Sequence, residues 1–183
     1  AARAFLETGA SVYVLDKDLR RLQYLDETIG LSGKLVTMVS HDFNVRKAAR
    51  FADVLVGAVL ISGERSPIVV PRAVVKSMKA RSVLVDISID QGGCFEDSRP
   101  TTHADPTYRV HDSLFYCVAN MPGVVPHTST WALTNVTLPY LLELADQGWQ
   151  QACRRDHALA LGLNLHAGHI TYKAVAEALD TMG

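Results

Sequence analysis

The sequence predicts an α/β fold built on a doubly wound parallel sheet. Runs typical of strands alternate along the chain with segments rich in helix formers, and this rhythm favours right-handed strand–helix–strand crossovers. Residues 54–61 (VLVGAVLI) are nearly unbroken in their hydrophobicity, as is usual for a strand buried on both faces of a parallel sheet. A second apolar run, residues 82–89, leads straight into Asp90 and Gly92-Gly93, so a carboxylate is expected where a strand ends in a sharp turn.

The first part of the chain is expected to alternate helix and strand. A segment rich in helix formers stops at Gly9, and a β-branched run that ends at Asp16 follows it. Leu19, Leu22 and Leu25 have the spacing of the apolar face of a short helix. The predicted elements are helices over residues 1–8, 18–27 and 45–51 and strands over residues 11–15 and 34–39.

The remaining strands follow the same rhythm. Pro71 suits the first turn of a helix that would run to about Lys79. After the strand over residues 82–89, a long loop passes through residues 98–103, and the apolar run 114–118 predicts one more strand.

The character of the sequence changes near residue 130. An apolar stripe predicts one long helix, kinked at Pro139 and ending near Gly148, and residues 149–160 predict a further helix. The less regular tail carries His157, His166 and His169, which have no fixed metal-ligand spacing and are expected at the surface. We therefore divide the chain into a sheet domain, residues 1–128, and a helical segment, residues 129–183.

Composition excludes several classes of partner. The chain has 183 residues, of which 48% are hydrophobic, and its net charge of -1 offers no basic face to nucleic acid or to an anionic membrane. No apolar run is long enough to span a bilayer, and no targeting segment is recognisable. Cys94, Cys117 and Cys153 form no C-x-x-C pair, which favours a reducing compartment. A cytoplasmic protein that binds small molecules and no metal is expected.

Asp16 occupies the place of a ribose-binding acid. In dinucleotide-binding domains, a G-x-G-x-x-G turn opens the first helix, and an acidic residue about 20 positions further on binds the adenosine ribose. Counting back from Asp16 puts those glycines before Ala1, and the chain begins without methionine as if in the middle of a helix. The sequence thus predicts a fragment that lacks the phosphate loop and the first strand, which would lie at the sheet centre. A helix N-cap for residues 18–27 is the competing interpretation of the acid.

Asp90 also has two interpretations. Asp and Gly are common in turns for purely local reasons, so Asp90 could simply form the turn with the glycines that follow it. Alternatively, it lies at the carboxyl end of a parallel strand, where open α/β sheets bind their ligands.

Three stretches of the chain carry long, specific motifs: VLVDISIDQGGCFEDSRPTTH (residues 83–103), ADVLVGAVLISG (residues 52–63) and FYCVANMPGVVPHTSTWALTN (residues 115–135). Together these stretches closely resemble the alanine dehydrogenase family. The resemblance implies a Rossmann-type NAD-binding domain whose C-terminal helices return to a catalytic domain outside these residues. It further implies a homo-oligomer, a hexamer, that catalyses reversible oxidative deamination of L-alanine to pyruvate and ammonia, with hydride passing from Cα to the nicotinamide.

The same resemblance assigns roles to individual residues. Asp90 matches the active-site aspartate, which would orient substrate or water and stabilise cationic intermediates. Asp16 matches the ribose-binding acid, which favours NAD over NADP. The other residues implied to contact the cofactor are Arg21, Ser40, Val59, Leu60, Ile87, Ser88, Ile89, Arg99, Val118, Ala119, Asn120 and Met121, together with Asp90 itself. The family's catalytic histidine and pyruvate-binding lysine and arginine belong to the other domain.

Two alternatives stay open. The NAD(H)-binding subunit of nicotinamide nucleotide transhydrogenase is a homologue that transfers hydride between nucleotides and binds no amino acid. The fragment as such could also be an inactive nucleotide-binding module.

Overall fold

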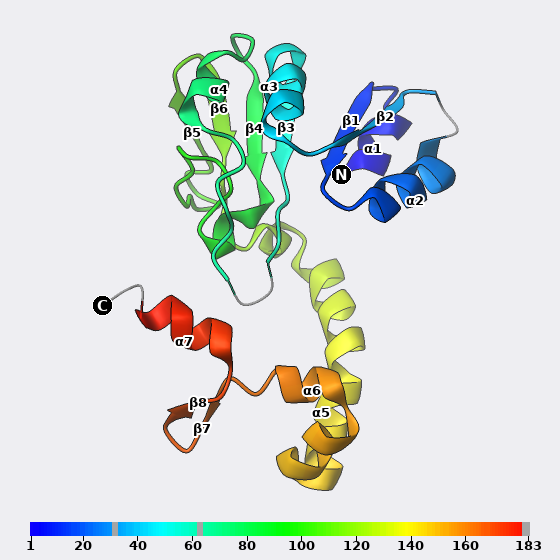
Figure 1. The fold of residues 1–183 in the computed structure, drawn as a ribbon, viewed down its shortest axis with the longest axis vertical. Coiled ribbons are helices and arrows are strands. Elements are labelled where there is room, and N and C mark those ends of the chain that lie inside the picture. The colour runs from blue at the N-terminus through cyan, green and yellow to red at the C-terminus, as the bar shows by residue number, and fades with distance from the viewer. Residues whose placement is uncertain (31–32, 62–63, 181–183) are drawn as a thin grey trace. The chain divides into compact units, whose positions relative to one another are not determined.

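The computed structural model describes residues 1–30, 33–61 and 64–180. The chain divides into two compact units (Figure 1). The first unit comprises Ala1–Leu60 and Ser66–Ala119, and the second comprises Ile61–Arg65 and Asn120–Gly183. Assignment of residues 129–183 to a catalytic domain stays a prediction.

The first unit alternates helices and strands, as the sequence predicts. In chain order its elements are α1 (Ala2–Glu7), β1 (Val12–Asp16), α2 (Leu19–Ile29), β2 (Leu35–Val39), α3 (Asp42–Phe51), β3 (Val54–Gly57), α4 (Arg72–Lys76), β4 (Val83–Asp86), the 3₁₀ helix η2 (Ile87–Gln91), β5 (Thr107–Val110) and β6 (Ser113–Tyr116).

The strands of this unit form two sheets. β1 and β2 pair in parallel, and a four-stranded sheet has the order β3-β4-β6-β5. Its β3-β4 and β4-β6 pairs are parallel, whereas β5 is antiparallel to β6. Among the described residues no strand pairs with the remaining edge of β1 or of β3. The predicted parallel α/β architecture is therefore confirmed, and the sheet is interrupted between β1 and β3, where the central strand was expected.

The apolar core of the first unit lies between the helices α3 and α4 and the four-stranded sheet. Leu84 of β4 and Phe115 of β6 are fully buried, and the Phe95 ring packs edge-on against Phe115 with centroids 6.1 Å apart. Val74 and Val75 of α4 and Ala49 of α3 cover the same cluster. This packing explains why residues 83–85 of β4 are all apolar.

Several predicted boundaries were wrong for identifiable reasons. β3 ends at Gly57, and two residues further on both backbone groups of Val59 bond to the Ser88 hydroxyl and not to β4. β4 ends at Asp86 because that side chain accepts the Ser88 N–H and turns the backbone into η2. β5 was not predicted at all. Leu19, expected on the apolar face of its helix, is 65% exposed.

The second unit is mainly helical. Its elements are η3 (Met121–Val124), α5 (Pro126–Arg155), α6 (His157–Leu161), β7 (Leu165–His166), β8 (His169–Ile170) and α7 (Lys173–Asp180). The backbone leaves helical geometry at Gly148 (φ 72°, ψ 158°), near the predicted helix end. The predicted helix over 149–160 is interrupted at Asp156, which caps α6, and the tail contains the β7-β8 hairpin and α7.

None of the helices in the described part of the chain is both long enough and apolar enough to cross a membrane.

Candidate functional site

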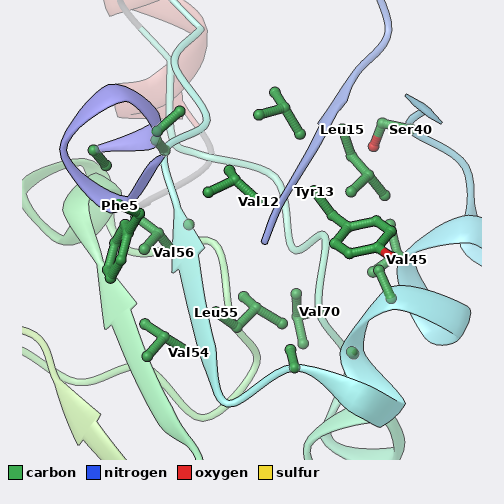
Figure 2. A pocket seen from close by; sticks show the side chains of 18 of the residues that line it. Phe5, Val12, Tyr13, Leu15, Ser40, Val45, Val54, Leu55, Val56 and Val70 are labelled. Carbon is green, nitrogen blue, oxygen red and sulfur yellow. The ribbon is translucent and has the colours of Figure 1, made fainter. Parts of the chain in front are cut away.

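An apolar groove separates β1 from β3 (Figure 2). It encloses about 850 Å³, and its walls are residues 12–16 of β1 and residues 54–57 of β3, with Phe5 and Val45 from the neighbouring helices. Asp16, Ser40 and Val59, all predicted to bind the cofactor, lie in its lining. The structure thus gathers at one groove the residues that end β1 and follow β2 and β3.

Asp16 ends β1 and has polar partners on both carboxylate oxygens. Its Oδ1 accepts the backbone N–H of Asp18 at 2.8 Å, and its Oδ2 lies 3.9 Å from Nη1 of Arg21. The N-cap of α2 is Asp18, which accepts the Arg20 N–H, so the capping interpretation applies to Asp18 and not to Asp16. The Arg21 side chain is 75% exposed, and the Asp16 side chain is 34% exposed. A carboxylate and a guanidinium, both reachable from solvent, therefore stand together after β1.

Asp90 lies on η2, a 3₁₀ helix with one buried and one exposed side. Ser88 and Ile89 are buried, whereas Ile87 and Asp90 are exposed. The Ser88 hydroxyl donates to the carbonyl of Val59 and accepts its N–H, each at 2.8 Å, and so attaches η2 to the segment after β3. The exposed face of η2, with its carboxylate, is held beside the end of β3.

Two glycines end η2 in a conformation that favours glycine. Gly92 and Gly93 have φ values of 94° and 79°. A Cβ at Gly93 would also lie 2.9 Å from Oδ2 of Asp86 and 2.7 Å from Cβ of Ser98. Backbone geometry therefore favours glycine at both positions, and close packing against Asp86 requires it at Gly93 as well.

Arg99 is held by Tyr108 of β5. Its guanidinium carbon lies 4.0 Å from the centre of the Tyr108 ring, a cation–π arrangement, and its backbone N–H donates to the Tyr108 hydroxyl at 2.9 Å. That hydroxyl in turn donates to the carbonyl of Asp97. Tyr108 therefore fixes both the backbone and the exposed guanidinium of Arg99.

The segment after β6 pairs with the loop that carries Arg99. The N–H of Thr101 donates to Cys117, and the N–H of Ala119 donates to Thr101, at 2.9 and 3.1 Å. Val118 is fully buried, and Ile89 is 5% exposed, so neither is accessible from solvent in this structure. Leu60 is 70% exposed. Asn120 and Met121 belong to the second unit, where Asn120 has a left-handed backbone (φ 53°).

Asp86, Ser98 and Tyr108 are polar residues of this region that the sequence reasoning missed. Asp86 is fully buried and accepts hydrogen bonds from Ser98 and from backbone N–H groups of the η2 region. A signal was present, since an aspartate inside an otherwise apolar strand run needs hydrogen-bond donors around it. No cluster of three or more potential metal ligands occurs within the described ranges.

Because the Cys94 thiol is buried, we expect the folded state to lose stability as the pH becomes alkaline. Burial, followed by the negative charge of Asp86, raises the pKa of its thiol to about 12. A raised folded-state pKa means that the stabilisation is complete below the ordinary thiol pKa and is lost as the pH rises toward the folded value. Between pH 8 and pH 10, we expect the unfolding free energy to fall by about 1–2 kcal/mol more than in Cys94→Ala.

Urea unfolding of both proteins at the two pH values measures this difference. If the unfolding free energy falls equally in the two proteins, the Cys94 thiol does not contribute to the pH dependence of stability.

The fold and the arrangement of these residues define a class of protein. The strands are mainly parallel and alternate with helices. Asp16 ends β1, Ser40 follows β2, and Asp90 lies on η2 after β4. This arrangement is typical of a Rossmann-type, nucleotide-binding α/β domain. The sequence profile of the alanine dehydrogenase/PNT C-terminal domain matches residues 1–173, and the chain belongs to this family. The domains of this family bind NAD.

Individual relatives agree with the family. The chain is 53% identical over 180 residues to alanine dehydrogenase of Mycolicibacterium smegmatis, an alignment that covers 98% of the chain and 48% of that protein. It is 52% identical over 176 residues to alanine dehydrogenase of Mycobacterium tuberculosis, covering 96% of the chain and 47% of the relative. The chain thus spans about half the length of the curated relatives it matches.

Solved structures give the same result. A structure of L-alanine dehydrogenase aligns over 100% of this chain and 50% of its own, with a TM-score of 0.84 and 42% identity. A transhydrogenase from Sinorhizobium meliloti aligns with a TM-score of 0.65 and 19% identity over 92% of this chain and 44% of its own, which shows a shared fold.

Proposed function

We propose that this chain supplies the NAD-binding part of an enzyme that oxidatively deaminates L-alanine to pyruvate and ammonia, reversibly. The observation that carries the proposal is the placement of Asp16 and Asp90 after parallel strands, in a chain 53% identical to an alanine dehydrogenase over 98% of its length. NAD would accept hydride from the substrate Cα, and the protein would orient the substrate and transfer protons.

The residues after β1 fit the adenosine end of NAD. The Asp16 carboxylate can accept hydrogen bonds from ribose hydroxyls, and it would repel a 2′-phosphate at the same position. Arg21, whose guanidinium is 3.9 Å from that carboxylate, offers a positive charge to the adenosine side. Ser40, whose N–H donates to the Asp16 carbonyl at 2.9 Å, would border the adenine. This set of donors and acceptors suits NAD.

The proposed catalytic group is the carboxylate of Asp90. It is exposed on η2, and Ser88, two residues earlier, anchors that helix to Val59. A carboxylate there can orient the attacking water and stabilise the cationic imine and carbinolamine stages of deamination. Arg99, held on Tyr108, would bind the negatively charged cofactor. Contacts through Val59, Leu60, Ile87, Ser88, Ile89, Val118, Ala119, Asn120 and Met121 are part of the same proposal.

The second unit supports the proposal that its helices pack against further protein in a homo-oligomer. Many large apolar side chains of α5 are exposed, among them Trp131, Val136 and Leu141, each between 60% and 62%. Exposed apolar surface of this extent usually marks a site of contact with other protein. Sedimentation of the protein at its natural full length, with a hexamer as the expected species, tests this.

The activity is tested by NADH formation from L-alanine and NAD, using the protein at its natural full length. Alanine-dependent NADH formation supports the proposal. Hydride exchange between NADH and NADP without any response to alanine would favour the transhydrogenase alternative. Binding of NAD without either reaction would favour the inactive nucleotide-binding module.

The nucleotide preference tests Asp16. In Asp16→Ala we expect NAD to bind about tenfold more weakly relative to NADP, since two ribose hydrogen bonds are lost and Arg21 becomes available to a 2′-phosphate. Titration with both nucleotides measures the ratio. Asp112→Ala, which removes the same charge from the exposed turn between β5 and β6, is the matched control and should leave the ratio unchanged. A ratio that is also unchanged in Asp16→Ala would refute the ribose role.

A further inference from the structure

Asp86 is a buried carboxylate around which the chain wraps after β4. Its side chain is fully buried, and both oxygens accept hydrogen bonds. Oδ1 accepts the Ser88 N–H at 3.0 Å and the Cys94 thiol at 3.4 Å. Oδ2 accepts the N–H groups of Cys94 and Phe95 at 2.8 and 3.4 Å and the Ser98 hydroxyl at 2.5 Å. No cation pairs with it among the described residues, so these dipoles stabilise the carboxylate.

The donors come from both sides of the glycine turn. Ser88 lies within η2, before the glycines, whereas Ser98 lies twelve residues after Asp86 along the chain. One side chain therefore fixes where η2 starts, where the chain re-enters the core at Cys94, and where the loop toward Arg99 begins. The 2.9 Å approach that a Cβ at Gly93 would make to Oδ2 shows how closely the chain surrounds this oxygen.

We propose that Asp86 is a positioning residue that sets the locations of Asp90 and Arg99. The proposal rests on the proposed function for its catalytic consequence. Asp86 itself is buried and cannot touch substrate. It acts through Ser88, which is two residues from Asp90, and through Ser98, which is adjacent to Arg99. The Asp86 carboxylate thereby fixes the two segments that carry Asp90 and Arg99, the groups proposed to contact substrate and cofactor.

An amide cannot replace this carboxylate. Each oxygen of Asp86 faces at least one backbone N–H, so either orientation of an asparagine would place its own NH₂ against a donor. Asp86→Asn is therefore isosteric and yet mismatched, and it carries the risk of misfolding. Ser98→Ala is the milder variant, since it removes one donor to Oδ2 and leaves the carboxylate with its backbone partners.

The chain offers a matched control on the same strand. Ser82 immediately precedes β4, is 2% exposed, and shares a 2.8 Å hydroxyl–hydroxyl hydrogen bond with Ser113. Ser82→Ala also removes one buried side-chain hydrogen bond, but at the amino end of β4. A general loss of stability would affect both variants alike, whereas of the two serines replaced only Ser98 bonds to Asp86 and can alter the positions of Asp90 and Arg99.

The experiment uses the protein at its natural full length and compares Ser98→Ala, Asp86→Asn and Ser82→Ala. We expect amide hydrogen exchange at residues 88, 94 and 95 to accelerate about tenfold in Ser98→Ala, the effect of roughly one hydrogen bond, and more in Asp86→Asn. Ser82→Ala should leave these amides unchanged. We further expect kcat with L-alanine to fall about tenfold or more in Ser98→Ala, with KM nearly unchanged, because small displacements of reacting groups cost rate.

The outcomes separate the two proposals. If the unsubstituted protein does not oxidise L-alanine, the proposed function fails, and the exchange data still decide whether Asp86 fixes this segment. Exchange at residues 88, 94 and 95 that is no faster in Ser98→Ala than in Ser82→Ala would overturn the positioning role. An active protein in which both serine variants lower kcat equally would overturn it as well.

Discussion

Replacing Asp90 by asparagine in the protein at its natural full length is expected to lower kcat for L-alanine oxidation by about 10²- to 10⁴-fold. The substitution keeps the size of the side chain and removes the charge that would stabilise cationic intermediates and relay protons. Asp90 is exposed on η2, outside the apolar core, so the fold should tolerate the change. We expect the NAD dissociation constant to change far less than kcat, since the remaining proposed NAD contacts are intact.

Steady-state kinetics and NAD titration measure the two quantities separately. Asp105→Asn, which removes another exposed carboxylate from the loop before β5, is the control and should have normal kcat. If Asp90→Asn turns over L-alanine at the normal rate, Asp90 is only a turn residue, the alternative that its sequence context left open.

Gly57→Ala is expected to destabilise the first unit by about 3 kcal/mol, the upper end of the usual cost of overpacking a core. Gly57 ends β3, and a Cβ there would lie 2.3 Å from the Cys94 sulfur and 2.7 Å from the Phe95 ring. Both neighbours are buried, with exposures of 0% and 1%, so neither can move aside without displacing the core around Leu84 and Phe115.

The midpoint of urea unfolding measures this effect. Gly30→Ala is the matched control, because Gly30 has an ordinary φ of -73° and its added Cβ would be 3.6 Å or more from every neighbour. We expect the control to unfold at nearly the normal urea concentration. A midpoint for Gly57→Ala close to that of Gly30→Ala would mean that the core relaxes around the added methyl group.

The sequence predicted most of the first unit because its core strands have simple patterns. Residues 83–85 and 114–116 are apolar runs bounded by turns, and both are strands of the four-stranded sheet. η2 could not be predicted this way, because residues 87 and 89 continue the apolar pattern of β4. At that point the Asp86 side chain accepts the Ser88 N–H and turns the backbone, an interaction that hydrophobic periodicity does not record.

For the candidate site, the sequence indicated the residues at strand ends but not those placed by tertiary contacts. Acids after strands, Asp16 and Asp90, are visible in the sequence because strand ends are recognisable. Tyr108 was missed because β5, with the sequence TYRV, has no continuous apolar run of the kind found in β3, β4 and β6. Its contact with Arg99 is a tertiary one that sequence spacing alone does not reveal.

The interruption between β1 and β3 has a consequence for how the first unit opens. The β1-β2 pair and the four-stranded sheet share no ladder hydrogen bond in the described chain, so side-chain packing, such as that of α3 on β1, is what joins them. Parts of a domain that are joined in this way can separate at a lower free energy than that of global unfolding. A strand seated in the groove would bond to the free edges of β1 and β3 and would join the β1-β2 pair and the four-stranded sheet into one sheet. The folding cooperativity of the domain, and with it the distance between Asp16 and the carboxyl end of β4, would then depend on that strand.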